Sequence, residues 1–411
     1  MEQAGRTEKR AVIGVTRETA QNERRVALIP DAVKRYVSAG HTVLIERGAG
    51  TASSYTDDAY SSAGGTLVDS AEGVYRQADL ILRVQRPDRN AIMQMRPGTM
   101  LIGFLSPMLN AELVTELRDQ GITALSMDAV PRISRAQSMD ALSSQATVGG
   151  YKAVLLAADN LPKFFPLLMT AAGTIPPAKV VILGAGVAGL QAIATARRLG
   201  AKVKAYDFRP VVKEQVMSLG AQFIEIDTGE SGEGTGGYAR EAGADTLARQ
   251  QAGLAPHIAE ADVVITTAAV PGRPAPRLIP TSTVERMPTG AVIVDLAAES
   301  GGNCELTRPG EVVEHNGVLV MGLLNLPSMM PFHASQMYSK NLQNLLELIL
   351  NKEGAVTLNL DDEIIAGATV THRNEILHQG TRKAMGLAEP APAPPASATA
   401  PAGSGSTAPS A

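Results

Sequence analysis

The sequence is poor in cysteine, in aromatic residues and in long apolar runs. Cys304 is the only cysteine among 411 residues, tryptophan is absent, and aromatic residues make up 3% of the chain. A single cysteine excludes an internal disulfide and a thiolate-bound metal cluster, and it suits a reducing compartment. With 37 basic and 41 acidic side chains the net charge is only −4, so the composition gives no electrostatic reason to expect a nucleic-acid or anionic-lipid partner.

The chain also lacks a clear membrane-crossing segment. A transmembrane helix needs about 20 mostly apolar residues in succession, whereas the longest candidate, Val180–Ala196, contains three glycines and runs into Arg197 and Arg198. The first residues are charged and no long apolar stretch follows them, which is not the pattern of a signal peptide. We therefore expect no direct membrane insertion.

Short apolar runs alternate with helical segments in two series, one beginning at Ala11–Val15 and the other at Lys179. Such alternation predicts right-handed crossovers and largely parallel sheets. The predicted fold class is therefore α/β, with two Rossmann-like doubly wound parallel-sheet domains that flank a cleft and are joined by long helices.

The joining helices are expected over Ser143–Asp159 and His333–Lys352, because apolar residues recur there at helical spacing. If the second helix returns the chain to the first domain, that domain is discontinuous; the alternative is that this helix packs only on the second domain. We predict a first domain over residues 1–142 plus 333–385 and a second over 143–332. Residues 386–411 are rich in proline and alanine and are expected to be disordered.

The most specific motif is Gly-Ala-Gly-Val-Ala-Gly at residues 184–189. It follows an apolar strand and opens a helix, which is the context that a dinucleotide-binding turn requires. Gly184 would allow the tight turn, Gly186 the approach of a pyrophosphate, and Gly189 close packing of helix on strand. The pyrophosphate would meet the free N–H groups at the helix start, from Val187 onward.

Asp207 ends the next strand, 18 residues beyond Gly189. An acidic residue there accepts hydrogen bonds from the adenosine ribose and repels a 2′-phosphate, which favours NAD(H) over NADP(H). Arg209 could instead accommodate such a phosphate. Because Asp207 lies at the strand tip itself, we predict that the second domain binds NAD(H) and that both residues contact it.

Small residues follow a later strand at Thr267, Ala268 and Ala269, where they would leave room for a ring or a ribose or would simply end the strand. Asp295 and Glu299 follow the next strand and could face the nicotinamide, cap a helix or be surface charges.

The segment between Asp227 and Arg240 is rich in glycine. This composition suggests a mobile lid in which Gly237 and Tyr238 close over the dinucleotide, with an ordinary surface loop as the alternative.

Three segments carry a resemblance to a known family: NERRVAL at residues 22–28, VPRISRAQSMDALSSQ at 130–145 and IVDLAAESGGNC at 293–304. They resemble the NAD(H)-binding alpha component (domain I) of proton-translocating nicotinamide nucleotide transhydrogenase, and the likeness covers about residues 10–380. That family is itself similar to alanine dehydrogenase.

The resemblance implies roles for a loop at the nicotinamide end of the dinucleotide. Arg132 and Asp140 would anchor the carboxamide, Gln137 would bridge toward the ribose of a second nucleotide, and Ser143 would make a further contact. Arg132, Gln137 and Asp140 are therefore the predicted catalytic residues. Alternatively, Asp140 or Ser143 caps the linking helix and Arg132 is a solvated charge.

Alanine dehydrogenases move a proton as well as a hydride, so they need a lysine or histidine near the reacting carbon. The family pattern has these groups where this chain has Gln85 and Ser106. Arg25, which matches the carboxylate-binding arginine, remains. Hydride transfer between two nicotinamides needs no proton transfer, so the replacements favour transhydrogenation.

The predicted function is the NAD(H)-binding subunit of a proton-translocating transhydrogenase, with NADP(H) bound on a partner component and a membrane-spanning subunit that couples the hydride transfer to proton movement. The resemblance also implies a homodimer located in the cytoplasm on the inner face of the cell membrane. The histidines show no metal-ligand spacing, so no metal is expected. The alternatives are an alanine dehydrogenase-like oxidoreductase and a noncatalytic NAD-sensing or scaffold subunit.

Overall fold

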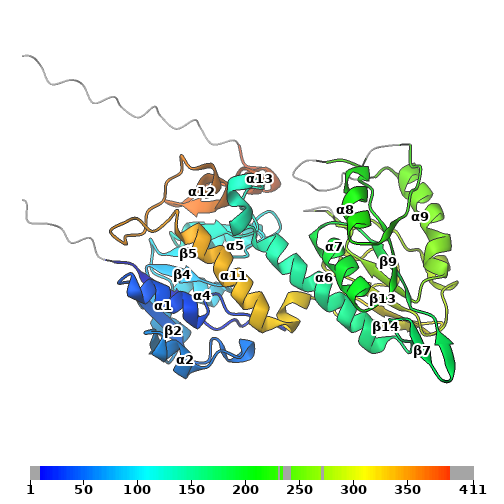
Figure 1. The fold of residues 1–411 in the computed structure, drawn as a ribbon. Coiled ribbons are helices and arrows are strands. Elements are labelled where there is room, and N and C mark those ends of the chain that lie inside the picture. Colours follow the sequence, from blue (N-terminus) through cyan, green and yellow to red (C-terminus); the bar gives the residue numbers. More distant parts are fainter. Residues whose placement is uncertain (1–9, 230–231, 235–241, 270–272, 389–411) are drawn as a thin grey trace, which may run out of the picture.

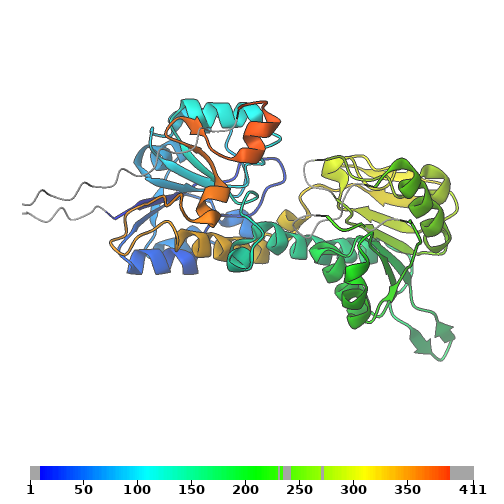
Figure 2. The same cartoon turned by 90° about the horizontal axis from the view of Figure 1, so that it is seen from above.

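The computed structural model describes residues 10–229, 232–234, 242–269 and 273–388, which form two lobes joined by helices (Figures 1 and 2). Each lobe is built on one large sheet with mostly parallel strands, so the predicted α/β class with two doubly wound sheets is confirmed. Residues 389–411 of the predicted tail lie outside the described residues. Within the described part, no helix combines the length and the apolar character needed to cross a bilayer.

The sheet of the first lobe has eight strands in the order β3-β2-β1-β4-β5-β6-β16-β17. The strands are β1 (Val12–Val15), β2 (Thr42–Glu46), β3 (Thr66–Val68), β4 (Leu80–Leu82), β5 (Met100–Gly103), β6 (Thr123–Ser126), β16 (Thr369–His372) and β17 (Glu375–Ile376). Only β16 and β17 pair in the antiparallel sense. The first lobe therefore takes strands from both ends of the described chain.

Helices cover both faces of this sheet. On one face α1, α11 and α12 contribute Val33, Tyr338 and Ile364 to the core, and on the other α3, α4 and α5 contribute Val74, Ile92 and Leu117. The helices of this lobe are α1 (Pro30–Ser38), α2 (Asp57–Ser62), α3 (Ala71–Gln77), α4 (Arg89–Gln94), α5 (Ala111–Asp119), α11 (Pro331–Leu346), α12 (Glu363–Ala368) and α13 (Gln379–Ala384).

The sheet of the second lobe has the order β11-β10-β9-β12-β13-β15-β14, with only β14 antiparallel to its neighbour. Its strands are β9 (Lys179–Leu183), β10 (Lys202–Tyr206), β11 (Gln222–Phe223), β12 (Val263–Thr266), β13 (Val292–Asp295), β14 (Val312–His315) and β15 (Val318–Met321). A separate hairpin of β7 (Leu168–Thr170) and β8 (Gly173–Ile175) extends from this lobe, away from the first one (Figure 2). The strand order reverses between β9 and β12, which is where ligands bind in doubly wound sheets.

The core of the second lobe also has two halves. On one face α6 (Ala141–Asn160), α7 (Val187–Arg198) and α8 (Lys213–Ser218) pack against β9. On the other face α9 (Ala244–Ala259) and α10 (Thr281–Val284) pack against β12 and β13. Short 3-10 helices complete the chain: η1 (Thr51–Ser53), η2 (Ser134–Met139), η3 (Pro210–Val212), η5 (Ala298–Ser300) and η6 (Leu326–Met329).

Helix α6 (Ala141–Asn160) runs from the first lobe into the second (Figures 1 and 2). Its apolar face joins the core beneath β9 through Ala153, Val154 and Ala157. The helix approaches α7 closely at Gly150, where a Cβ atom would lie 2.1 Å from the carbonyl oxygen of Ala188. This contact fixes the linking helix against the helix that begins at the glycine-rich turn.

Candidate functional site

A cleft of about 1440 Å³ lies between the two lobes. It is bordered by the turn after β9, the ends of β10 and β12, the start of α6 and the loops after β4, β5 and β6. The predicted site residues that line it are Arg132, Asp140, Ser143, Gly184, Gly186, Val187, Asp207, Arg209, Thr267, Ala268 and Ala269. Gln137 and Gly189 are described but do not line the cleft, and Gly237 and Tyr238 lie outside the described residues.

The three glycines of the turn occupy different environments. Gly184 has a φ of +96°, and a Cβ atom there would lie 2.6 Å from Thr267 Oγ1. A Cβ atom on Gly189 would lie 1.8 Å from the carbonyl oxygen of Gly184, so only glycine allows this approach of helix to turn. Gly186 lines the cleft, and a Cβ atom there would meet no other atom within 4 Å. The turn has the shape that a pyrophosphate at a helix N-terminus requires.

The loop after β12 is fixed by a buried asparagine that sequence reasoning assigned no role. The Asn303 side-chain amide accepts a hydrogen bond from the Ala268 N–H at 3.0 Å and donates to the carbonyl oxygens of Ala268 and Pro276, each at 2.8 Å. Thr267 Oγ1 donates to the Gly184 carbonyl oxygen at 3.0 Å. These bonds fix the part of the cleft wall that lies next to the glycine turn.

Asp295 also stabilises the loop after β12, through bonds to Thr266 and Asn303. Its buried carboxylate accepts hydrogen bonds from Thr266 Oγ1 at 2.8 Å, Thr307 Oγ1 at 2.6 Å and the Asn303 N–H at 2.7 Å. The sequence left open a nicotinamide contact, a helix cap or a surface charge for Asp295, whereas the structure shows a buried carboxylate that supports this loop. Glu299 is exposed, lines the cleft and accepts a hydrogen bond from the Asn325 N–H at 3.2 Å.

Asp207 and Arg209 form a bidentate ion pair at the end of β10. Asp207 Oδ1 accepts from the Arg209 N–H at 2.8 Å and from Arg209 Nε at 2.9 Å, while Oδ2 accepts from the Ala185 N–H at 2.7 Å and from Arg209 Nη2 at 2.9 Å. A carboxylate offers about four lone-pair directions. A ribose that binds Asp207 would therefore replace at least part of the Arg209 guanidinium.

The loop before α6 places Asp140 as the cap of that helix. Asp140 Oδ1 accepts from the Ser143 N–H at 2.9 Å, and Oδ2 accepts from Ser143 Oγ at 2.6 Å. The capping role that the sequence left open is observed, and both side chains also border the cleft. Gln137 lies in η2 with an exposed side chain, and Arg132 is exposed at the cleft wall.

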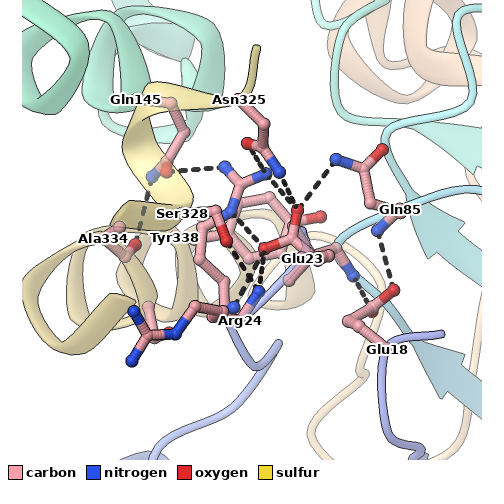
Figure 3. Close-up of polar contacts among 12 residues, drawn as sticks. Glu18, Glu23, Arg24, Gln85, Gln145, Asn325, Ser328, Ala334 and Tyr338 are labelled. Atoms are coloured by element: carbon pink, nitrogen blue, oxygen red, sulfur yellow. Dashed lines mark hydrogen bonds and ion pairs between the residues drawn. The ribbon is translucent and has the colours of Figure 1, made fainter. Parts of the chain in front are cut away.

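A buried network of polar residues forms the floor of the cleft on the first-lobe side (Figure 3). Arg25 donates from Nε and Nη2 to Glu23 at 2.8 and 2.6 Å, from Nη1 to Gln145 Oε1 at 2.8 Å and from Nη2 to Asn325 Oδ1 at 3.1 Å. Burial raises the pKa of Glu23, but hydrogen bonding to Arg25 and the charge of Arg25 outweigh it and lower this pKa to about 2. Gln85 donates to Glu23 Oε2 at 2.9 Å. Arg25 is thus neutralised inside the protein.

A second buried ion pair lies beside the first. Glu18 accepts from Arg83 Nη2 at 3.2 Å and from the N–H groups of Val84 and Gln85 at 2.6 and 3.2 Å. Burial raises the pKa of Glu18 despite the charge of Arg83. These residues follow β1 and β4, where the strand order of the first sheet reverses. The place where a doubly wound sheet would hold a ligand is therefore occupied by the protein's own side chains.

Comparison with known proteins matches the chain to two consecutive family models. Residues 14–149 match the model of the alanine dehydrogenase/PNT N-terminal domain, and residues 153–379 match that of the alanine dehydrogenase/PNT C-terminal domain. The chain belongs to the alanine dehydrogenase/PNT family. The family resemblance expected from the sequence is confirmed.

Within the alanine dehydrogenase/PNT family, the chain is more similar to transhydrogenase subunits. It is 45% identical to the NAD(P) transhydrogenase subunit alpha of Cereibacter sphaeroides over 89% of this chain and 70% of that protein. The crystal structure of transhydrogenase from Sinorhizobium meliloti matches with a TM-score of 0.81 and 43% identity, over 89% of this chain and 99% of that one. A structure of L-alanine dehydrogenase matches with a TM-score of 0.77 and 28% identity, over 91% and 99%.

The described lining of the cleft is poor in lysine and histidine. Among the described residues that line it there is no lysine, and the one histidine is His378, which sequence reasoning did not select. His378 Nδ1 lies 2.7 Å from Thr381 Oγ1 and accepts from the Thr381 N–H at 3.2 Å, so this histidine caps α13. Burial lowers the pKa of His378. The described residues contain no group of three or more His, Cys, Asp or Glu arranged to hold a metal.

Proposed function

We propose that this chain binds NAD(H) in its cleft and exchanges a hydride directly with NADP(H) held by a partner component of a transhydrogenase. The observation that carries the proposal is the pairing of two features in one cleft. The second lobe offers an open glycine turn at Gly186 beside Asp207, and the first lobe offers a wall in which Arg25 is already neutralised by Glu23.

The chemistry of the cleft favours this reaction over amino-acid oxidation. A keto acid needs a cation for its carboxylate and an acid or base for its carbonyl or imine. The guanidinium of Arg25 is bonded to Glu23, Gln145 and Asn325. Transfer between two nicotinamides requires instead that the rings be held with the reacting atoms about 3–3.5 Å apart and that water be excluded.

The residues at the start of α6 would position the nicotinamide. We assign Arg132 and Asp140 to the carboxamide and Ser143 to a further contact, since all three border the cleft. Gln137 lies outside the cleft lining on exposed η2, which is a suitable place for a side chain that reaches toward a nucleotide on another protein.

The proposed partners are an NADP(H)-binding component and a membrane-spanning component that couples hydride transfer to proton translocation. The support is the 45% identity to a transhydrogenase subunit alpha, a name that implies further subunits. Such partners would hold this chain at the cytoplasmic face of the cell membrane.

Replacing Gln137 by asparagine is expected to slow hydride exchange about tenfold or more while NADH affinity changes less than twofold. The shorter side chain keeps the amide but cannot span the same gap to the second nucleotide. Stopped-flow exchange with an NADP(H)-binding component gives the rate, and NADH fluorescence titration gives the affinity. If the exchange rate and the NADH affinity fell by the same factor, the result would contradict a bridging role for Gln137.

The proposed homodimer finds support in the β7–β8 hairpin, which projects from the second lobe (Figure 1). This hairpin exposes the apolar side chains of Met169 and Ile175. Met169 is 79% exposed, and an isolated two-stranded hairpin is only marginally stable in water. Replacing Met169 by aspartate is expected to raise the dimer dissociation constant about tenfold or more in sedimentation equilibrium. Met93, which is 66% exposed on the first lobe, gives the control Met93→Asp. A monomeric wild type, or equal effects of both variants, would contradict the proposal.

A direct assay separates the proposed function from the alanine dehydrogenase alternative. The purified chain is incubated with NADH, pyruvate and ammonium, and the loss of NADH absorbance is followed. We expect no steady turnover, because the cleft holds Gln85 and Ser106 where the dehydrogenase pattern has its lysine and histidine. Sustained oxidation of NADH would overturn the proposal.

A further inference from the structure

The loop that carries Gln137 is held from outside the cleft by two asparagines of α11. Asn341 Nδ2 donates to the Ser138 carbonyl oxygen at 2.9 Å, and Asn344 Nδ2 donates to the same oxygen at 2.8 Å. The two asparagines are three positions apart, so they lie on one face of the helix. Neither of them lines the cleft. The main chain next to Gln137 is therefore fixed by the helix with which the chain re-enters the first lobe.

The same loop is anchored on either side of Gln137. Ala136 and Met139 are buried in the apolar core of the first lobe, which α11 also helps to form. Arg135 Nη1 and Nη2 donate to the two carboxylate oxygens of Asp362, the N-cap of α12, at 2.8 and 3.0 Å. Gln137 is thus an exposed side chain on a segment whose neighbouring residues are fixed.

Stability alone does not account for the amide of Asn341. The residue is 5% exposed, and its Oδ1 has no hydrogen-bond partner within the described part of the chain. A buried acceptor without a partner lowers stability, and an apolar side chain of the same shape would avoid that loss. The bond that this amide does make is the one to Ser138. An asparagine here therefore points to a role in holding the loop.

We propose that Asn341 and Asn344 are positioning residues for hydride transfer, an inference that rests on the proposed function. They hold the carbonyl group of Ser138, and with it the adjacent Gln137, at the place from which the Gln137 amide reaches the second nucleotide. Hydride transfer is sensitive to such placement, because the reacting atoms must lie about 3–3.5 Å apart. Since the two asparagines share one acceptor, either of them alone keeps the carbonyl bonded.

The test measures hydride exchange with an NADP(H)-binding component at saturating nucleotides, together with NADH affinity and melting temperature. Asn341→Leu and Asn344→Leu each leave one bond to Ser138 and should slow exchange less than about threefold, whereas the double variant should slow it about tenfold or more. In all three variants NADH affinity should change less than about twofold and the melting temperature less than about 3 °C. Gln343 Nε2 donates to the Ser339 carbonyl oxygen within α11, so the control Gln343→Leu should leave exchange unchanged.

A double-mutant cycle separates positioning from a general structural role. If the asparagines act through Gln137, adding both leucine substitutions to Gln137→Asn should slow exchange less than about twofold further. The pair Asn341→Ala and Asn344→Ala removes the same amides without adding bulk. The cycle is repeated with this pair, so the test does not depend on the folding of the leucine variants.

Each outcome bears on one claim. If the wild type exchanges hydride and the double variants do so at the same rate, the positioning role is overturned. It is also overturned if the double variants lose exchange, NADH affinity and melting temperature together, or if their losses add in full to that of Gln137→Asn. Failure of the wild type to exchange hydride with the NADP(H)-binding component would overturn the proposed function instead.

Discussion

Replacing Gly186 by alanine is expected to leave the fold intact and to weaken NADH binding on the order of 100-fold. Gly186 has φ −73° and ψ −168°, a conformation that alanine adopts without strain, and a Cβ atom there meets no other atom within 4 Å. The methyl group would fill the space that the proposed site reserves for the pyrophosphate. The substitution should therefore lower the affinity for NADH without lowering the free energy of unfolding.

Gly189→Ala is the matched comparison for this prediction. Its methyl group would lie 1.8 Å from the Gly184 carbonyl oxygen, so the start of α7 must shift and the free energy of unfolding must fall. Thermal denaturation and NADH titration of both variants give the two quantities. A Gly186→Ala protein that binds NADH like the wild type would show that no pyrophosphate approaches this turn.

Replacing Glu23 by glutamine is expected to lower the free energy of unfolding by about 3–5 kcal/mol, because Arg25 then remains buried without its anionic partner. The two side chains are 0% and 3% exposed, and their closest N–O distance is 2.6 Å. Urea denaturation at pH 7 measures the effect. The exposed pair Arg35–Glu347 provides the control, since Glu347→Gln should cost less than about 1 kcal/mol.

The same residue predicts a pH dependence. The pKa of Glu23 falls from 4.5 to about 2 on folding, so the folded state binds its proton less readily than the unfolded state. The resulting stabilisation, about 3 kcal/mol, is complete above the unfolded pKa near 4.5 and is lost as the pH falls toward 2. The difference in the free energy of unfolding between the wild type and Glu23→Gln should therefore become smaller below pH 4.5. A gap that is constant down to pH 3 would contradict the assignment.

The sequence predicted the elements whose signal is local. The apolar runs of β9, β10, β12 and β13 and the glycines between β9 and α7 specify a doubly wound sheet without reference to distant residues. The short strands β16 and β17 were not predicted. They carry few apolar residues, and β16, with which β17 pairs, joins the sheet through β6, which lies far earlier in the chain. Their place depends on a tertiary contact that a local pattern does not encode.

In the candidate site, the sequence likewise did not predict the contacts that depend on residues far apart in the chain. Residue types at strand ends indicated which positions border the cleft, but not what each side chain bonds. Asp295 turned out to support a loop, and Asp140 to cap α6, because their nearest donors are backbone and hydroxyl groups. The neutralisation of Arg25 depends partly on Gln145 and Asn325, which lie 120 and 300 positions away. Asn303 was missed because a buried polar residue carries no periodic signal.

Hydride exchange in a mixture of this chain with a purified NADP(H)-binding transhydrogenase component tests the central claim most directly. NADH that carries deuterium at both C4 positions is added with NADP⁺, and the isotope content of the NADPH formed is measured by mass spectrometry. The account predicts NADPH that carries the deuterium, formed only when both proteins are present. NADPH without the label would contradict the account, and so would NADH that binds the chain but passes no hydride.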